Sequence, residues 1–370
     1  MNASTICERI HKVCSDFLSG EWSKVKASDF EIRPIEVGKS NRLFAVSLPK
    51  AVKTSKREPS KVLVRFYGNE FTGEGNRYKI VGEVVENVVF CLLAERNLGP
   101  KLYGIFDGGR IEEFIESRNM TTEEILESDT LQTLASKIAR MHCMKMPVSK
   151  KQVDILAVLK NNLEIISANG IDISALSEEK KNIYRLISMA DFKSEVDFIF
   201  KLYKNTKQRL IFCHNDLNPT NFLLKCDENS NDKKEIVIID FENCFWNFRS
   251  IDLGKFFGEQ MITLKAKEEE TNYCASDEQI RLFVRAYLNE LKLVDEEFDE
   301  AIDNEETLVL EIEIGILMVH IFTSIWNLIH PDAANDALYS IENCWLRYQL
   351  YKKLKTNFCQ KHSALINSLF

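Results

Sequence analysis

The stretch His214-Asn215-Asp216-Leu217-Asn218-Pro219-Thr220-Asn221 decides the fold of this chain, together with Ile238-Ile239-Asp240-Phe241-Glu242 farther along. Apolar residues directly before His214 predict a short strand, so Asp216 is expected just beyond a strand end. A second apolar run directly before Asp240 predicts another strand, which ends at that aspartate. The pattern is therefore Asp-x-x-x-x-Asn followed by an aspartate at the end of a strand.

This spacing is typical of phosphotransferases that move a phosphoryl group from a nucleotide to a hydroxyl. In that chemistry Asp216 accepts the hydroxyl proton, while Asn221 and Asp240 hold Mg²⁺ against the phosphates of ATP. Amide and carboxylate oxygens suit Mg²⁺, and ATP supplies further ligands. Taken singly, Asp216 is more simply a loop residue in an Asx-turn and Asp240 a turn residue. The three residues together predict a kinase-type site.

The composition limits the number of domains, the partners and the location that we expect for this protein. The chain has 370 residues, which suggests two domains or lobes, and 45% hydrophobic residues, enough for sizeable cores. Its net charge of -8 gives no general attraction for nucleic acid or for an anionic membrane, so neither is expected as a partner. The ten scattered cysteines contain no C-x-x-C pair, which indicates reduced thiols and a cytoplasmic location.

Neither a signal peptide nor membrane insertion is expected. Residues 1–10 lack the apolar run of a signal peptide. Residues 315–329 form the most apolar stretch, but they include His320 and fall short of the about 20 residues that a spanning helix needs. We therefore expect this segment to be a buried core helix.

The order of predicted elements indicates an α+β protein with the two-lobed layout of protein kinases. The region before the motif predicts the order β-β-β-α-β-β, after a first helix at 4–18. These elements are a hairpin at 31–48, a strand at 61–67, a helix at 80–96 and a hairpin at 102–115. From about residue 121 the chain is mostly helical, with strands expected near 210–213, 221–225 and 235–240. We expect residues 1–115 to form a small antiparallel-sheet lobe that binds the nucleotide. Residues 116–370 would form a larger, mainly helical lobe for catalysis and substrate binding.

Two features of the first lobe could contact phosphates. Arg65 lies on the third expected strand, where protein kinases carry a phosphate-contacting lysine, and its guanidinium is a permanently charged fork. Glu86 lies on the next helix, in a position able to pair with Arg65. The turn Gly38-Lys39-Ser40-Asn41 could cap phosphates with its N–H groups, although a plain hairpin turn explains it equally well. A lone arginine on a strand is more often a surface residue, so the order of elements carries the assignment.

Several further stretches follow one another in an order known from one family. They are Val62–Gly68, Leu92–Phe106 with Gly109–Arg118, Phe212–Asp216 with Asn221–Leu224, and Ile239–Glu242 with Asn247–Arg249 and Asp252–Gly254. In these stretches, over about residues 30–350, the chain resembles the choline/ethanolamine kinase family. The His-Asn-Asp and Asp-Phe-Glu motifs are shared with aminoglycoside-type kinases. The run Leu98-Gly-Pro-Lys-Leu-Tyr-Gly104 is similar to choline kinases rather than to ethanolamine kinases.

The resemblance implies an ATP- and Mg²⁺-dependent choline kinase of phospholipid biosynthesis, with Asp216 as base at the substrate hydroxyl and Asn221 and Asp240 as metal ligands. Glu259 and Trp326 would lie at the cationic head of the substrate. The residues that would surround ATP are Gly38, Lys39, Ser40, Asn41, Arg42, Leu43, Arg65, Glu86, Glu113, Phe114, Ile115, Arg118, Asn218 and Asp240. Relatives often dimerise, which leaves a homodimer open.

The chain departs from the family where choline would bind. A quaternary ammonium is normally held by an aromatic cage through cation–π contacts. The family's aromatic positions here read Asn243, Gln260, Leu264 and Thr323, with later ones near Leu338 and Asn343, and Trp326 alone remains of a tryptophan pair. Other aromatic residues could compensate, although aromatics at helical spacing more often belong to the core: Trp246, Phe256, Phe257, Phe322, Tyr339 and Trp345. Three hypotheses therefore stand: a choline kinase, a kinase for ethanolamine or another small amino alcohol, and a catalytically weak scaffold or dimer partner of this fold.

Overall fold

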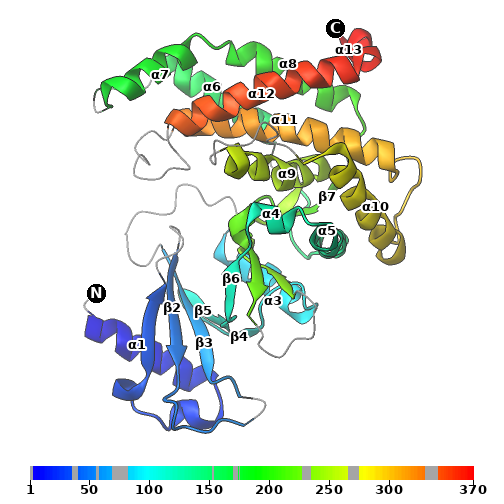
Figure 1. The fold of residues 1–370 in the computed structure, drawn as a ribbon. Coiled ribbons are helices and arrows are strands. Elements are labelled where there is room, and N and C mark those ends of the chain that lie inside the picture. The colour runs from blue at the N-terminus through cyan, green and yellow to red at the C-terminus, as the bar shows by residue number, and fades with distance from the viewer. Residues whose placement is uncertain are drawn as a thin grey trace. The chain divides into compact units, whose positions relative to one another are not determined.

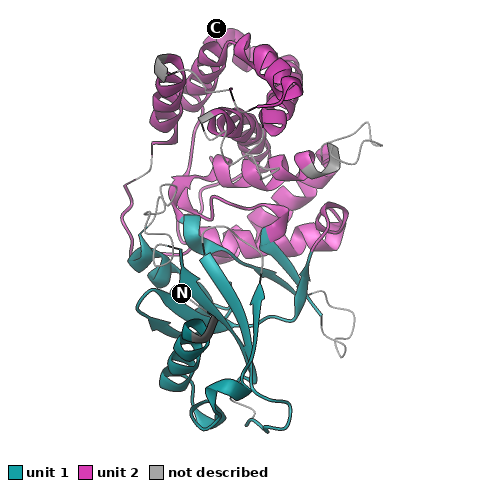
Figure 2. Ribbon diagram, turned by 90° about the vertical axis from the view of Figure 1, so that its left-hand side faces the viewer, with its two compact units in different colours: residues 1–119, 221–244 teal, residues 120–220, 245–370 magenta. Residues whose placement is uncertain are grey.

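The chain forms two compact units in the computed structural model (Figure 2). Unit 1 comprises residues 1–119 and 221–244, and unit 2 comprises residues 120–220 and 245–370. The structure describes residues 3–35, 41–55, 58–68, 82–151, 154–169, 174, 176–226, 235–265, 275–329 and 341–370.

Unit 1 is built on a five-stranded antiparallel sheet with the order β1-β2-β3-β5-β4 (Figure 1). Its strands are β1 (Glu31–Ile35), β2 (Asn41–Ser47), β3 (Lys61–Tyr67), β4 (Leu102–Phe106) and β5 (Gly109–Glu113). Helix α1 (Ala3–Phe17) supplies Ile10 to the same core as Val64 and Phe66 of β3. Gly109 lets β5 approach β3 closely, because a Cβ there would lie 2.1 Å from the carbonyl oxygen of Arg65.

A second, three-stranded sheet explains why residues 221–244 belong to unit 1. Its order is β6-β8-β9, with β6 (Ser117–Asn119), β8 (Phe222–Lys225) and β9 (Ile236–Ile238) all antiparallel. Phe241, directly after β9, packs edge-on against Phe90 of α3 (Glu83–Glu95), with ring centroids 6.1 Å apart. The short 3₁₀ helices of this unit are η1 (Gly20–Ser23), η2 (Ala27–Asp29) and η4 (Phe241–Asn243), and η3 (Pro219–Asn221) lies where the chain enters it.

Unit 2 is mainly helical, with one two-stranded antiparallel sheet of β7 (Leu210–Cys213) and β10 (Phe245–Phe248). Its helices are α4 (Thr122–Ile125), α5 (Ser128–His142), α6 (Ile155–Asn169), α7 (Glu178–Ser188), α8 (Phe192–Asn205), α9 (Arg249–Lys265), α10 (Asp277–Val294), α11 (Glu305–Ile329), α12 (Ile341–Lys361) and α13 (Ser363–Leu369). Helices α9 and α11 touch through Gly254 and Gly315, since a Cβ on Gly254 would lie 2.2 Å from the carbonyl carbon of Gly315. This close contact fixes the helix that carries the charged residues described below.

Helix α11 contains the apolar segment that the sequence singled out. Residues 305–328 are long and apolar enough to cross a membrane, but 78% of their most apolar window is buried inside the protein. Ile314, Leu317 and Ile321 share one core with helices α6, α8 and α12. The prediction of a core helix is therefore confirmed.

The predicted α+β fold and the order β-β-β-α-β-β are confirmed, while strands β6 and β10 were missed. The compact units differ from the predicted lobes in that residues 116–119 and 221–244 lie with the N-terminal sheet. The division of roles between residues 1–115 and residues 116–370 stays a prediction, because the compactness of a unit does not test what it binds.

Candidate active site

The loop that carries Asp216 begins where β7 ends, as the sequence predicted. Asn215 shapes this loop with a left-handed backbone, φ 63°, a conformation that asparagine tolerates better than most residues. Its side-chain oxygen accepts a 2.7 Å hydrogen bond from the amide of Asn247 on β10. Its own amide donates to the carbonyl of Cys213 at 3.3 Å. The residue before Asp216 is thus fixed through both its backbone and its side chain.

Asp252, at the start of α9, fixes the same loop by accepting hydrogen bonds from its backbone. Its two oxygens accept the backbone N–H groups of His214 at 2.8 Å and of Asn215 at 2.7 Å. It also accepts the Nε2–H of His142 at 2.9 Å. Burial alone would raise the pKa of Asp252, but the hydrogen bonds from His142 and His214 outweigh it and lower the pKa. Asp252 is therefore a buried, ionised acceptor for the backbone next to Asp216.

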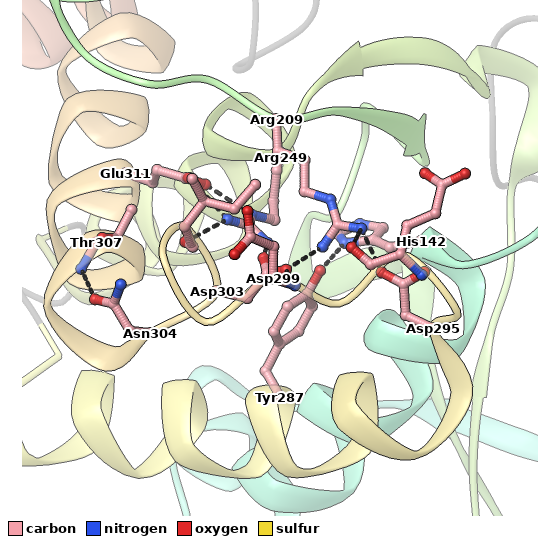
Figure 3. Close-up of polar contacts among 12 residues, drawn as sticks. His142, Arg209, Arg249, Tyr287, Asp295, Asp299, Asp303, Asn304, Thr307 and Glu311 are labelled. Carbon is pink, nitrogen blue, oxygen red and sulfur yellow. Dashed lines mark hydrogen bonds and ion pairs between the residues drawn. The ribbon is translucent and has the colours of Figure 1, made fainter.

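His142 and Tyr287 hold Asp252 in place through hydrogen bonds, and Figure 3 shows the contact between His142 and Tyr287. Burial lowers the pKa of His142, so its imidazole is neutral and has one donor and one acceptor nitrogen. Nε2 faces the carboxylate of Asp252 and must carry the proton, so Nδ1 accepts from the hydroxyl of Tyr287 at 2.8 Å. Tyr287, His142 and Asp252 form one hydrogen-bonded chain that ends on the loop of Asp216. The sequence reasoning missed His142 and Tyr287.

Asp216 and Glu259 are linked by Lys255, which the sequence reasoning also missed. The Lys255 ammonium lies 3.5 Å from Oδ1 of Asp216 and 3.0 Å from Oε1 of Glu259, one helical turn along α9. Oε2 of Glu259 accepts a 2.7 Å hydrogen bond from Arg347 of α12. Trp326, predicted at the substrate, lies half-buried on α11 and stacks on Phe322 with ring centroids 6.0 Å apart.

The charges of this group follow from their mutual attraction. Burial alone would raise the pKa of Glu259, but Arg347 and Lys255 hold the pKa well below its usual range. Burial alone would lower the pKa of Lys255, but the carboxylates of Glu259 and Asp216 outweigh it and raise the pKa. Glu259 is therefore an anion, and Lys255 a cation, at neutral pH.

In unit 1, Asn221 and Asp240 lie at the same end of two paired strands. Asn221 directly precedes β8 and Asp240 follows β9, and the pairing of Phe222 with Ile238 brings these strand ends together. Ile239 N–H donates to the carbonyl oxygen of Asn221 at 3.1 Å. Asp240 has a left-handed backbone, φ 69°, which is uncommon outside glycine and is often found at functional positions. Their amide and carboxylate oxygens are the donor set that fits Mg²⁺.

The predicted nucleotide residues of β2 reach the same end of unit 1. The side-chain amide of Asn41 donates to Glu242 at 3.0 Å, two residues beyond Asp240. Arg42 lies over the ring of Phe44, 5.6 Å from its centroid, and Leu43 pairs with Arg65 across β2 and β3. Gly38, Lys39 and Ser40 lie outside the described residues.

Arg65 and Glu86 belong to one buried charge cluster, although two other residues join them. Arg65 donates to Glu112 at 2.6 Å, and Arg110 donates to Glu112 at 2.7 Å and to Glu86 at 2.6 Å. Burial alone would raise the pKa of Glu112, but the two arginines outweigh it and lower the pKa. Arg110 and Glu112, which sequence reasoning missed, alternate along β5, and Arg110 pairs in register with Arg65. Arg65 and Glu86 therefore belong to one cluster, but Glu112 and Arg110 stand between them in place of the predicted direct pair.

The remaining predicted nucleotide residues are spread over both units. Between β5 and β6, Oε2 of Glu113 accepts the N–H of Lys101 at 3.1 Å, and the Lys61 ammonium lies 3.8 Å from the ring centroid of Phe114. Ile115 accepts a 3.0 Å hydrogen bond from the hydroxyl of Ser117, and Arg118 donates to the carbonyl of Asn119 at 3.2 Å. In unit 2, Asn218 accepts the N–H of Thr220 at 3.0 Å, as in an Asx-turn. The nucleotide roles of these residues stay predictions.

Known proteins are similar to this chain in sequence and in fold. The choline/ethanolamine kinase family matches residues 32–352. A choline/ethanolamine kinase from Homo sapiens is 30% identical over 363 residues, which cover 96% of this chain and 88% of the relative. Among solved structures, choline kinase from Cryptosporidium parvum Iowa II has a TM-score of 0.69 at 22% identity and covers 98% of each chain. An ethanolamine kinase from Plasmodium vivax has a TM-score of 0.67 at 20% identity, over 96% of this chain and 90% of that one.

An N-terminal antiparallel sheet followed by a mostly helical region is thus the fold of choline-kinase-like phosphotransferases. The chain belongs to the choline/ethanolamine kinase family, as the resemblance implied. Its activity is accordingly that of a choline/ethanolamine kinase, a nucleotide-binding phosphotransferase.

Replacing Asp252 by asparagine should loosen the loop of Asp216. The N–H groups of His214 and Asn215 donate to different oxygens of Asp252, and in asparagine one of these positions is an NH₂ group that faces an N–H donor. We expect kcat to fall about 100-fold, the size of effect for a catalytic group displaced by about 1 Å. Steady-state kinetics with ATP checks this, with Asp197→Asn on the surface of α8 as the matched control. Equal kcat for the two variants would contradict the positioning role of Asp252.

Proposed function

We propose that this protein transfers the γ-phosphoryl group of ATP to the hydroxyl of a small amino alcohol, with Asp216 as the general base. One observation supports it above the others: Asp216 and Glu259 both lie within 3.5 Å of the same ammonium nitrogen, that of Lys255. A carboxylate that can accept a hydroxyl proton thus lies beside one that can pair with an amine. In choline and ethanolamine these two groups are separated by only two carbons, so both ends of one molecule can be held.

Asn221 and Asp240 would hold Mg²⁺, and their position at adjacent strand ends supports this role. When bound, Mg²⁺ neutralises charge on the phosphates of ATP. The buried cluster around Arg65 supports its proposed part in steadying the nucleotide, because Glu112 and Arg110 fix the guanidinium in place. Asn41, bonded to Glu242, would bring β2 to the same phosphates.

Choline and ethanolamine are both candidate acceptors. The prediction of choline depended on residues 98–104, which belong to unit 1, whereas Glu259 and its neighbours belong to unit 2. Gln260 stands at a position that is aromatic in the family, Asn343 lies near another such position, and both are buried. Asn343 accepts a 2.7 Å hydrogen bond from Nε of Arg347. A polar lining favours ethanolamine, because its amine can donate hydrogen bonds. The homodimer and the cytoplasmic location stay predictions.

An acceptor-dependent assay of the purified full chain tests the proposed function. ADP release from ATP is measured with ethanolamine or choline, first after stripping metal with EDTA and then with Mg²⁺ restored. We expect ADP release only when both an amino alcohol and Mg²⁺ are present. Release that needs no acceptor, or that is unchanged in EDTA, would overturn the proposed function.

A further inference from the structure

The Lys255 ammonium lies between two carboxylates, that of Asp216 on the loop after β7 and that of Glu259 on α9. Its Nζ is 3.0 Å from Glu259 and 3.5 Å from Asp216, and its side chain is 20% exposed. A lysine head is itself a primary alkylammonium with three N–H donors. The space between the two carboxylates therefore already holds the chemical group that an amino alcohol such as ethanolamine would present.

Arg347 differs from Lys255 in being a permanent part of this group. Its side chain is only 2% exposed, and it holds both Oε2 of Glu259 and Oδ1 of Asn343 at 2.7 Å. If this buried guanidinium moved away, the buried carboxylate of Glu259 would lose its partner, which is costly. One oxygen of Glu259 is thus occupied permanently, and Lys255 is the exchangeable partner of the other.

Two carboxylates and two cations leave this group without net charge. A substrate cation placed beside Glu259 would bring an excess positive charge unless Lys255 withdrew. Exchange leaves no buried carboxylate unpaired, because the incoming ammonium takes the place of the one that withdraws, and the flexible lysine side chain, 20% exposed, can turn toward solvent. Exchange of one ammonium for another is therefore the inexpensive way for an amine to enter.

We propose that the space between Asp216 and Glu259 is a primary-ammonium site, filled by Lys255 in the free protein and taken over by the amine of the substrate. This inference rests on the proposed function and narrows it: the acceptor is a primary amino alcohol such as ethanolamine, and Lys255 is a residue that determines specificity. A primary ammonium replaces the N–H donors of Lys255 group for group. A trimethylammonium has no N–H donor and relies on aromatic faces.

The surroundings of Glu259 agree with a ligand that forms hydrogen bonds. Gln260 follows it in α9, and His320 of α11 lies against Gly258, 3.8 Å from the Cβ position there. Both side chains are fully buried, and their polar atoms have no hydrogen-bond partner among the residues that the structure describes. Burial, together with Arg347, lowers the pKa of His320 to about 3, so its ring is neutral.

Binding of a methylation series to the full chain tests the inference by calorimetry. The ligands are ethanolamine, N-methylethanolamine, N,N-dimethylethanolamine and choline, and the proteins are the wild type, Lys255→Met, Lys255→Gln and Lys255→Arg. We expect affinity to fall with each methyl group in the wild type. Lys255→Met and Lys255→Gln should bind ethanolamine about fivefold more tightly, because no lysine ammonium then competes with the substrate for Glu259; fivefold corresponds to about 1 kcal/mol. Lys255→Arg keeps the cation and should show no such gain.

Lys292→Met is the matched control, since it removes a cation on α10 whose side chain is 64% exposed. It should leave the affinity for ethanolamine unchanged, which separates local exchange from a change in net charge. Choline binding as tightly as ethanolamine, or no gain in either neutral Lys255 variant, would overturn the inference. Kinetics separates the two proposals: a higher kcat/KM for choline would refute only the primary-ammonium site. Tight ethanolamine binding without phosphorylation would refute only the proposed reaction.

Discussion

Replacing Asp216 by asparagine is expected to lower kcat about a thousandfold while the protein stays folded. Asparagine has nearly the same shape, but it cannot accept the proton of the substrate hydroxyl, and general-base catalysis contributes about 10²- to 10⁴-fold to rates. The loop itself should persist, because its contacts do not depend on the side chain of Asp216. Asp252 accepts two of its backbone N–H groups, and Asn247 donates to the side chain of Asn215. Steady-state kinetics with saturating ATP and ethanolamine measures the loss.

Asp197→Asn serves as the control for this variant, since it also removes one carboxylate from unit 2 but lies at the surface. Its kcat should equal that of the wild type. The KM for ATP should change little in either variant, because Asp216 is assigned to the acceptor hydroxyl. A kcat of Asp216→Asn within tenfold of the wild type would contradict its role as the base.

Arg249→Met is expected to cause the largest loss of stability. Arg249 is fully buried and donates to both oxygens of Glu311 at 2.8 Å and to Asp303 at 2.5 Å (Figure 3). Asp303 also pairs with Arg209 at 2.6 Å. Methionine fills much of the volume but leaves Glu311 buried without its cation, and breaking such a pair costs about 3–5 kcal/mol. The free energy of unfolding in urea measures this loss.

Arg281→Met provides the comparison, because Arg281 also pairs with two acidic residues, Glu305 and Glu306, but at the surface. Solvent-exposed pairs contribute about 0–1 kcal/mol, so this variant should unfold almost like the wild type. Equal destabilisation by the two substitutions would show that burial does not decide the contribution of Arg249.

The sequence predicted those features that local pattern controls. The apolar residues of β3 and the turn residues around it predict the sheet, and apolar runs that end before His214 and Asp240 predict β7 and β9. Asp216, Asn221 and Asp240 were therefore expected at strand ends, which is where the structure has them. Strand β6 consists of polar residues only, Ser117 to Asn119, so it lacks the apolar pattern from which β7 and β9 were predicted.

What the sequence could not predict are pairings between distant segments. Glu86 was expected to meet Arg65, but the buried cluster also includes Arg110 and Glu112, which only the register of β3 and β5 brings to Arg65. Arg347 reaches Glu259 across 88 residues of sequence. Lys255 follows the Asp252–Gly254 motif directly, yet its contact with Asp216 depends on how α9 lies against the loop. No spacing rule indicates such partners in advance.

The identity of the phosphorylated product tests the central claim most directly. Phosphorus NMR of the full chain with ATP, Mg²⁺ and equal amounts of ethanolamine and choline distinguishes the two phosphate monoesters from inorganic phosphate. We predict phosphoethanolamine as the main product, formed in step with ADP. ADP accompanied by inorganic phosphate alone, or by no new phosphate ester, would contradict an amino-alcohol kinase.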